Sequence, residues 1–141
     1  MTRRRILFLL ICANLALIWG NSLMTGEGSG NFSGTVVAFL SRFLPFFSGE
    51  LGHTLLRKLA HFSEFACLCL LTAALRRQNG KKLLPCLGFG LAVACIDETI
   101  QVFVPGRGPS LIDVWIDTAG FATGLLFLVL GYTLIRKFFC K

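Results

Sequence analysis

Acidic side chains lie inside the apolar second half of this chain, where a charge is costly. Asp97 and Glu98 belong to one apolar run, and Asp113 and Asp117 belong to the next, with the turn 105–109 (Pro-Gly-Arg-Gly-Pro) between the two runs. A charged side chain near the centre of a bilayer costs about 2.5–3.5 kcal/mol on insertion scales, so such a group usually faces protein, water or a ligand. The four carboxylates therefore predict a polar site inside a membrane protein.

A lysine, a histidine and a further acid precede these four carboxylates in the sequence. Lys58, His61 and Glu64 follow i, i+3, i+6 spacing, which places them near one face of a helix. Such groups could bind the polar head of an amphiphile, with Arg57, Lys58 and Arg107 meeting an anionic head. They could instead perform acid–base catalysis on a lipid-linked substrate, or hold a divalent cation.

Motifs decide between these three kinds of chemistry only in part. The sequence contains no nucleophile elbow, phosphate loop or HExxH motif, and no short metal-ligand motif. We therefore predict no metal and no cofactor. Non-enzymatic binding is the preferred interpretation, and an enzyme that modifies an envelope lipid or a lipid-linked head group is the alternative.

Helical spacing extends the candidate site. Gln101 lies four residues after Asp97 and three after Glu98. Adjacent acids on a helix point about 100° apart, so Asp97 can meet a neighbouring helix while Glu98 faces a ligand. Arg107 is either a solvated turn residue or the counter-charge of a nearby acid. The candidate polar-site residues are Lys58, His61, Glu64, Asp97, Glu98, Gln101, Arg107, Asp113 and Asp117.

Small residues continue the last acidic stripe. Asp113, Asp117, Gly120 and Gly124 lie at offsets 0, 4, 7 and 11, along one face of a helix. A small-xxx-small pair lets two membrane helices approach closely, so Gly120 and Gly124 predict a packing face that holds the acids against other spans. Ser110 and Asp113 also match a capping box at the start of this helix.

Composition indicates the elements that must position these residues. Hydrophobic residues make up 55% of the 141 residues and charged residues only 15%, against about a quarter charged in soluble domains. The expected fold is a single all-α domain, residues 1–141, forming a four-helix membrane bundle. The predicted spans are approximately 6–24, 59–75, 83–104 and 111–135, with a loop at 25–31 and a short interfacial or re-entrant helix at 36–47.

The basic residues predict the orientation of the bundle. With four spans, ten of the fourteen Lys and Arg residues share the side of both termini, and four lie on the other side. The positive-inside rule then places both termini in the cytoplasm. The net charge of +7 is thereby explained by the membrane, and we predict no nucleic-acid partner. Glu64, Asp97 and Asp117 come to lie roughly 8–10 Å inside the outer boundary, at 1.5 Å per residue.

Three ordered motifs resemble the VanZ-like family. The first is Lys58-x-x-His61-Phe62-x-Glu64-Phe65, and the second begins at Asp97-Glu98-x-x-Gln101 and ends at Pro105-Gly106-Arg107. The third is Ser110-x-x-Asp113-x-x-x-Asp117-x-x-Gly120-x-x-x-Gly124. The similarity covers about residues 57–130. The chain departs from the family pattern at Asp117, where the family has Asn; Asp117 is then either protonated or paired with Lys58 or Arg107.

The resemblance implies a small multi-pass protein of the bacterial cytoplasmic membrane. The namesake of the family is associated with low-level resistance to teicoplanin, a lipid-bearing glycopeptide, with little effect on vancomycin. The implied function is thus a factor in the cell envelope that lowers sensitivity to lipidated glycopeptide antibiotics. The implied partners are membrane lipids and either a lipidated glycopeptide or a lipid-linked cell-wall precursor. Neither the ligand nor the oligomeric state follows from these residues.

Overall fold

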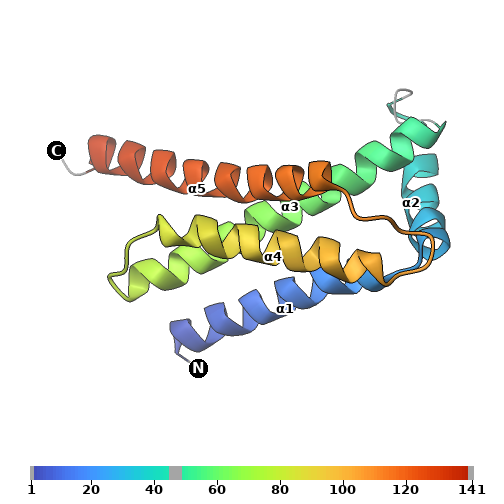
Figure 1. The fold of residues 1–141 in the computed structure, drawn as a ribbon. Coiled ribbons are helices and arrows are strands. Elements are labelled where there is room, and N and C mark those ends of the chain that lie inside the picture. Colours follow the sequence, from blue (N-terminus) through green and yellow to red (C-terminus); the bar gives the residue numbers. More distant parts are fainter. Residues whose placement is uncertain (1, 45–48, 140–141) are drawn as a thin grey trace.

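The fold is a bundle of four long helices closed at one end by a shorter one. The computed structural model describes residues 2–44 and 49–139, and every regular element within these ranges is a helix. Four helices run side by side and α2 lies across one end of them (Figure 1). The helices are α1 (Arg3–Leu23), α2 (Gly26–Leu40), α3 (Gly49–Gln78), α4 (Pro85–Val102) and α5 (Leu111–Phe139).

The four bundle helices are long and apolar enough to cross a membrane. This confirms the predicted all-α architecture with four spans. At 1.5 Å per residue, α4 with its 18 residues is about 27 Å long, close to the thickness of a hydrocarbon core. α3 has 30 residues and extends to about 45 Å, so its ends reach beyond that core.

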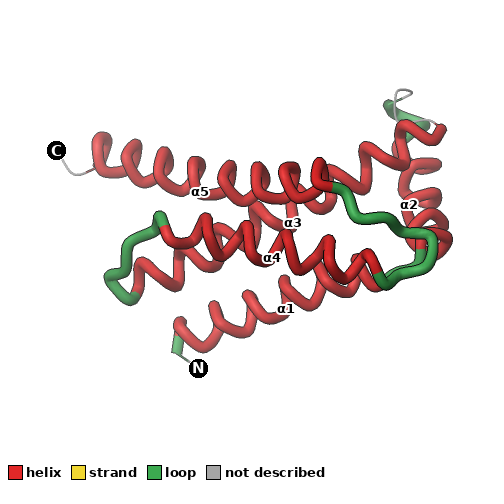
Figure 2. The backbone as a smooth tube through the Cα atoms, viewed as in Figure 1, coloured by secondary structure: helices red, strands yellow, loops and turns green. Residues whose placement is uncertain are grey.

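The connections divide the bundle into two different ends. Both termini and the loop between α3 and α4 lie at one end (Figure 1). The opposite end carries α2 and the long connection between α4 and α5, which Figure 2 shows as a loop that reaches across to α2. An even number of crossings brings the termini together. Their cytoplasmic location, which rests on the distribution of basic residues, stays a prediction.

Apolar side chains fill the centre of the bundle and also cover its outside. Ile18, Phe65, Leu68 and Phe121 are fully buried where α1, α3 and α5 meet α4. Large apolar side chains are exposed along the outer faces of the spans, where lipid tails would cover them. Examples of these exposed residues are Leu9, Leu17, Leu91, Trp115, Phe127 and Leu130.

The prediction for the segment after the first span is wrong in part. Residues 26–31, expected to be a Gly/Ser-rich loop, form the start of α2, and α2 ends at Leu40 rather than continuing to residue 47. Thr25 explains the early start, because its Oγ1 accepts a hydrogen bond from the backbone N–H of Gly28 at 3.1 Å. The backbone N–H of Gly26 also donates to the carbonyl of Pro105 at 3.1 Å, which ties α2 to the α4–α5 connection. Residues 45–47 of the predicted interfacial helix lie outside the described residues.

The helix that contains the second predicted span is longer than that span. The polar residues 57–64 suggested a boundary near residue 59, whereas α3 begins at Gly49. Its first turns pack against α2, where Ser33 Oγ lies 3.1 Å from His53 Nδ1. The polar residues are thus interior groups of a long helix rather than its boundary.

Candidate functional site

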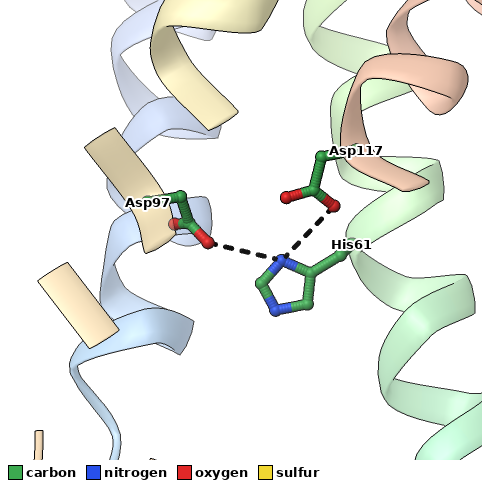
Figure 3. Close-up of side chains that lie close together, drawn as sticks. All are labelled: His61, Asp97 and Asp117. Carbon is green, nitrogen blue, oxygen red and sulfur yellow. Dashed lines mark ion pairs between the residues drawn. The ribbon is translucent and has the colours of Figure 1, made fainter. Parts of the chain in front are cut away.

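Three helices bring His61, Asp97 and Asp117 together in the interior of the bundle. His61 Nδ1 lies 3.7 Å from Asp97 Oδ2 and 4.0 Å from Asp117 Oδ1. Figure 3 shows the imidazole of α3 between the carboxylate of α4 and that of α5. Asp97 is 0% exposed and Asp117 is 1% exposed. We call these three residues the inner triad.

Asp97 is held in place by α1 and by its own helix. Its Oδ2 accepts hydrogen bonds from Ser22 Oγ at 2.7 Å and from Gln101 Nε2 at 3.2 Å. Both donors are buried. Oδ2 therefore stays directed toward His61, while Oδ1 has no hydrogen-bond partner among the described residues.

Asp117 is the least satisfied group of the triad. Both of its carboxylate oxygens are buried and lack a hydrogen-bond donor in the described part of the chain. Neither Lys58 nor Arg107 pairs with it, which excludes one of the two alternatives that the sequence left open and leaves protonation as the other. A buried carboxylate without donors is costly, so Asp117 requires a cation or a proton to be tolerated there.

Lys58 forms its ion pair with Asp113 instead. Lys58 Nζ donates to Asp113 Oδ1 at 2.5 Å, and the two side chains are 34% and 29% exposed. The pair joins α3 to the first turn of α5. Asp113 is also part of the cap, since its backbone N–H donates to Ser110 Oγ at 3.4 Å. In a full capping box, the Asp113 carboxylate would also accept a hydrogen bond from the backbone N–H of Ser110. That N–H donates to the carboxylate of Glu98 instead.

Glu98 fastens the start of α5 to α4. Its Oε2 accepts a hydrogen bond from the backbone N–H of Ser110 at 2.7 Å, and its Oε1 accepts one from Gln101 Nε2 at 3.1 Å. Glu98 as a whole is 6% exposed. This geometry gives Glu98 a positioning role, and the ligand contact expected of it stays a prediction.

Arg107 fastens the same connection to α1. Its Nη2 donates to the carbonyl of Asn21 at 2.9 Å and its Nε to the carbonyl of Met24 at 3.2 Å. These carbonyls lie at the C-terminal end of α1, where a cation also complements the helix dipole. Burial lowers the pKa of the Arg107 guanidinium, yet arginine keeps its proton in proteins. Arg107 is therefore a fixed positive charge on the cavity that His61 and Asp117 also line, rather than a solvated turn residue.

Glu64 lies at a separate contact within the polar layer. Its Oε1 accepts a hydrogen bond from Asn21 Nδ2 at 2.6 Å, and its Oε2 is buried without a donor among the described residues. No hydrogen bond or ion pair between described residues joins Glu64 to the inner triad. Of the predicted acids, Asp97 and Asp117 meet His61, while Glu98, Asp113 and Glu64 pair elsewhere.

Two residues of α1 belong to the polar layer although the sequence did not predict them. Asn21 and Ser22 bind Glu64 and Asp97, and in the sequence both lie at the end of an apolar span. A signal was present for Ser22 alone: Ile11, Asn14, Ile18 and Ser22, at offsets 0, 3, 7 and 11, are the buried residues of α1. Polar residues on that stripe identify the face that meets α3 and α4.

Two glycines allow α5 to approach α3 closely enough for these contacts. A Cβ at Gly120 would lie 2.3 Å from the carbonyl oxygen of Phe62, and a Cβ at Gly124 would lie 2.5 Å from that of Ala66. Both distances are far below a normal van der Waals contact. The small-xxx-small face thus lies directly on α3. Phe62, which Gly120 meets, is the residue that follows His61.

Two small cavities flank His61. One, of about 20 Å³, has room for about one water molecule or ion. It is lined by Arg57, Lys58, His61, Glu98, Gln101, Arg107, Asp113, Ile116 and Asp117. The other, of about 70 Å³, combines apolar and polar walls and is lined by Asn21, Met24, Ser29, Ser33, Leu56, Arg57, Ala60, His61 and Arg107. Arg57, His61 and Arg107 belong to both.

Negative charge exceeds fixed positive charge in this layer. The two cavities and the inner triad involve three permanent cations, Arg57, Lys58 and Arg107. The acids there number four, namely Asp97, Glu98, Asp113 and Asp117. If all four ionise and His61 is neutral, one negative charge is uncompensated. The excess is concentrated on the triad, because Lys58 and Arg107 are already engaged elsewhere.

The fold and the polar layer define a multi-pass helical membrane protein with a buried, acid-rich cluster near one end of its bundle. A family model described as VanZ/LLP1 matches residues 6–135, which is most of the chain. The chain therefore belongs to the VanZ/LLP1 family. The comparisons with curated proteins and with solved structures each return no match.

Proposed function

We propose that this protein is a non-enzymatic factor of the bacterial cell envelope that binds the anionic head of an amphiphile and lowers sensitivity to lipidated glycopeptides such as teicoplanin. The observation that carries the proposal is Arg57. It lines both cavities and is exposed, and it forms no ion pair among the described residues. Lys58 and Arg107, in contrast, have partners. Arg57 is thus the cation available to an incoming anion.

The size of the cavities limits what can enter. Sites that enclose a drug-sized ligand measure about 300–1,000 Å³, whereas the larger cavity here measures about 70 Å³. A phosphate or carboxylate group fits the scale of this site, and a whole glycopeptide does not. The acyl chain of the amphiphile would lie outside, along the exposed apolar faces of the spans. With the predicted orientation, the head would be met in the outer leaflet of the cytoplasmic membrane.

The inner triad favours a second candidate function. A histidine between two buried carboxylates, beside a cavity that admits water, is an arrangement suited to general acid–base or metal-assisted hydrolysis. The alternative is therefore an enzyme that modifies the head group of an envelope lipid. Binding at Arg57 is common to both candidates, and turnover separates them.

The test is expression in a susceptible Gram-positive host, with teicoplanin and vancomycin sensitivity measured side by side. The protein should reduce teicoplanin sensitivity and leave vancomycin sensitivity nearly unchanged. Arg57→Gln should remove the effect, whereas Lys137→Gln, which neutralises an exposed base near the other end of the bundle, should keep it. Equal activity of the two variants would overturn the role of Arg57. An effect on neither antibiotic would overturn the proposed resistance.

Mass spectrometry of a lipid extract incubated with the purified protein distinguishes the two candidates. The non-enzymatic proposal predicts a retained lipid of unchanged mass. A head-group change that depends on His61 would replace it with the enzymatic alternative.

A further inference from the structure

We propose that the inner triad is a binding site for a divalent metal ion, with His61 Nδ1, one oxygen of Asp97 and one oxygen of Asp117 as its ligands. The sequence predicts no metal, because no two of these residues lie within a short ligand motif. The three come from α3, α4 and α5, and only the packing of these helices brings them together.

The geometry of the three groups fits a metal ion. Their candidate ligand atoms all lie within 4.8 Å of one another. Ligands at about 2.1 Å from a tetrahedral ion are about 3.4 Å apart, and the observed separations from His61 Nδ1 are 3.7 and 4.0 Å. Closing the site around an ion would therefore take a few tenths of an ångström from His61 to each carboxylate and up to about 1.4 Å between the two carboxylates.

Asp117 provides the independent indication that something is bound here. It is 1% exposed, both of its oxygens lack a donor among the described residues, and it points toward His61 (Figure 3). Asp97 Oδ1, also buried, is without a donor as well. A divalent cation would compensate the negative charge that the fixed cations of this layer leave over.

The surroundings resemble those of known metal sites in two respects. Ligating carboxylates are usually held by hydrogen bonds from neighbouring groups, and Asp97 has them from Ser22 and Gln101. A catalytic zinc site has three protein ligands and keeps a fourth coordination position for water. The cavity of about 20 Å³, lined by His61 and Asp117, provides that position.

The donor set indicates the class of metal. Imidazole suits zinc and other first-row transition metals, and carboxylates suit harder ions such as manganese. One imidazole with two carboxylates therefore fits zinc or manganese better than magnesium or calcium, which prefer all-oxygen sites. The proposal concerns a different ligand from the amphiphile and does not depend on the proposed function.

The experiment uses the full chain, purified in detergent without a polyhistidine tag, treated with chelator and then titrated with Zn²⁺ or Mn²⁺ alone. We expect one equivalent of bound metal and a rise in Tm when it binds. The chain has only two histidines, so His61→Gln and His53→Gln form a matched pair. His61→Gln should lose binding and His53→Gln should keep it. Ser22→Ala should weaken binding by about 10–100-fold, as expected for loss of a group that orients a ligand.

Asp117→Leu tests the site even if a ligand variant is poorly folded. Replacing a buried carboxyl group that has no hydrogen-bond donor with an apolar side chain of similar size should raise the Tm of the metal-free protein and abolish the rise caused by metal. Asp113→Asn, which breaks the outer ion pair, should leave metal binding intact. The proposal is overturned if no tight equivalent of either metal is found, or if His61→Gln and Asp117→Leu bind as well as His53→Gln and Asp113→Asn.

Discussion

The close approach of α5 to α3 gives a prediction with a calculable size. An alanine Cβ at Gly120 would lie 2.3 Å from the carbonyl oxygen of Phe62 and 3.0 Å from its Cα. A close carbon–oxygen contact needs about 3.3 Å, so the helices must separate by about 1 Å. The obstacle is backbone rather than a flexible side chain, which means that no rotamer change can relieve it.

A matched variant on the same helix isolates this cost. Gly131 is also within α5, and a Cβ there meets nothing within 4 Å. Both substitutions gain about 0.5–1 kcal/mol from improved helix propensity, so that gain cancels in the comparison. The remaining packing penalty for Gly120→Ala is about 1–3 kcal/mol.

The assay is thermal unfolding of the full chain in one detergent at a fixed scan rate. A penalty of this size corresponds to a Tm about 2–12 °C lower for Gly120→Ala than for Gly131→Ala, at roughly 2–4 °C per kcal/mol. Because Phe62 follows His61 in α3, the displacement should also move His61 away from Asp117. If the two variants melt at the same temperature, α5 is not confined by the α3 backbone and the close-packing argument fails.

Two further predictions concern the docking of α2 and the orientation of the bundle in the membrane. Gly26→Ala should destabilise the protein and expose the 103–110 connection to protease, because its Cβ would lie 2.2 Å from the carbonyl oxygen of Gly106; Gly30→Ala, with no atom within 4 Å, should behave as wild type. Equal protease resistance of the two would contradict the docking of α2. In a background without the six native cysteines, a cysteine at Gly108 should be labelled in intact cells, whereas a reporter fused after Gly80 should be cytoplasmic. Labelling of Gly108→Cys only after permeabilisation would reverse the predicted orientation.

The sequence by itself determined the number and type of the main elements. Four continuous apolar runs of spanning length predict helices in a bilayer, where each helix satisfies its own backbone hydrogen bonds. The Gly120 and Gly124 stripe also identified the packing face of α5, since that signal depends only on spacing within one helix. Local pattern was less informative for α2: glycines and serines indicated a loop, whereas the Thr25 cap and the contacts with Pro105 and α3 make the segment helical.

The pairing of the polar groups was decided only by the tertiary structure. Periodicity showed that Lys58, His61, Asp113 and Asp117 face the interior, but not which of them meet. Two residues one helical turn apart can exchange partners with a small rotation or axial shift of the neighbouring helix, and sequence spacing does not fix that shift. The packing of α3 against α5 places Asp113 beside Lys58 and leaves Asp117, one turn deeper, beside His61 and Asp97. The assignment of the unsatisfied carboxylate to Asp117 therefore depends on helix register, a property of the assembled bundle.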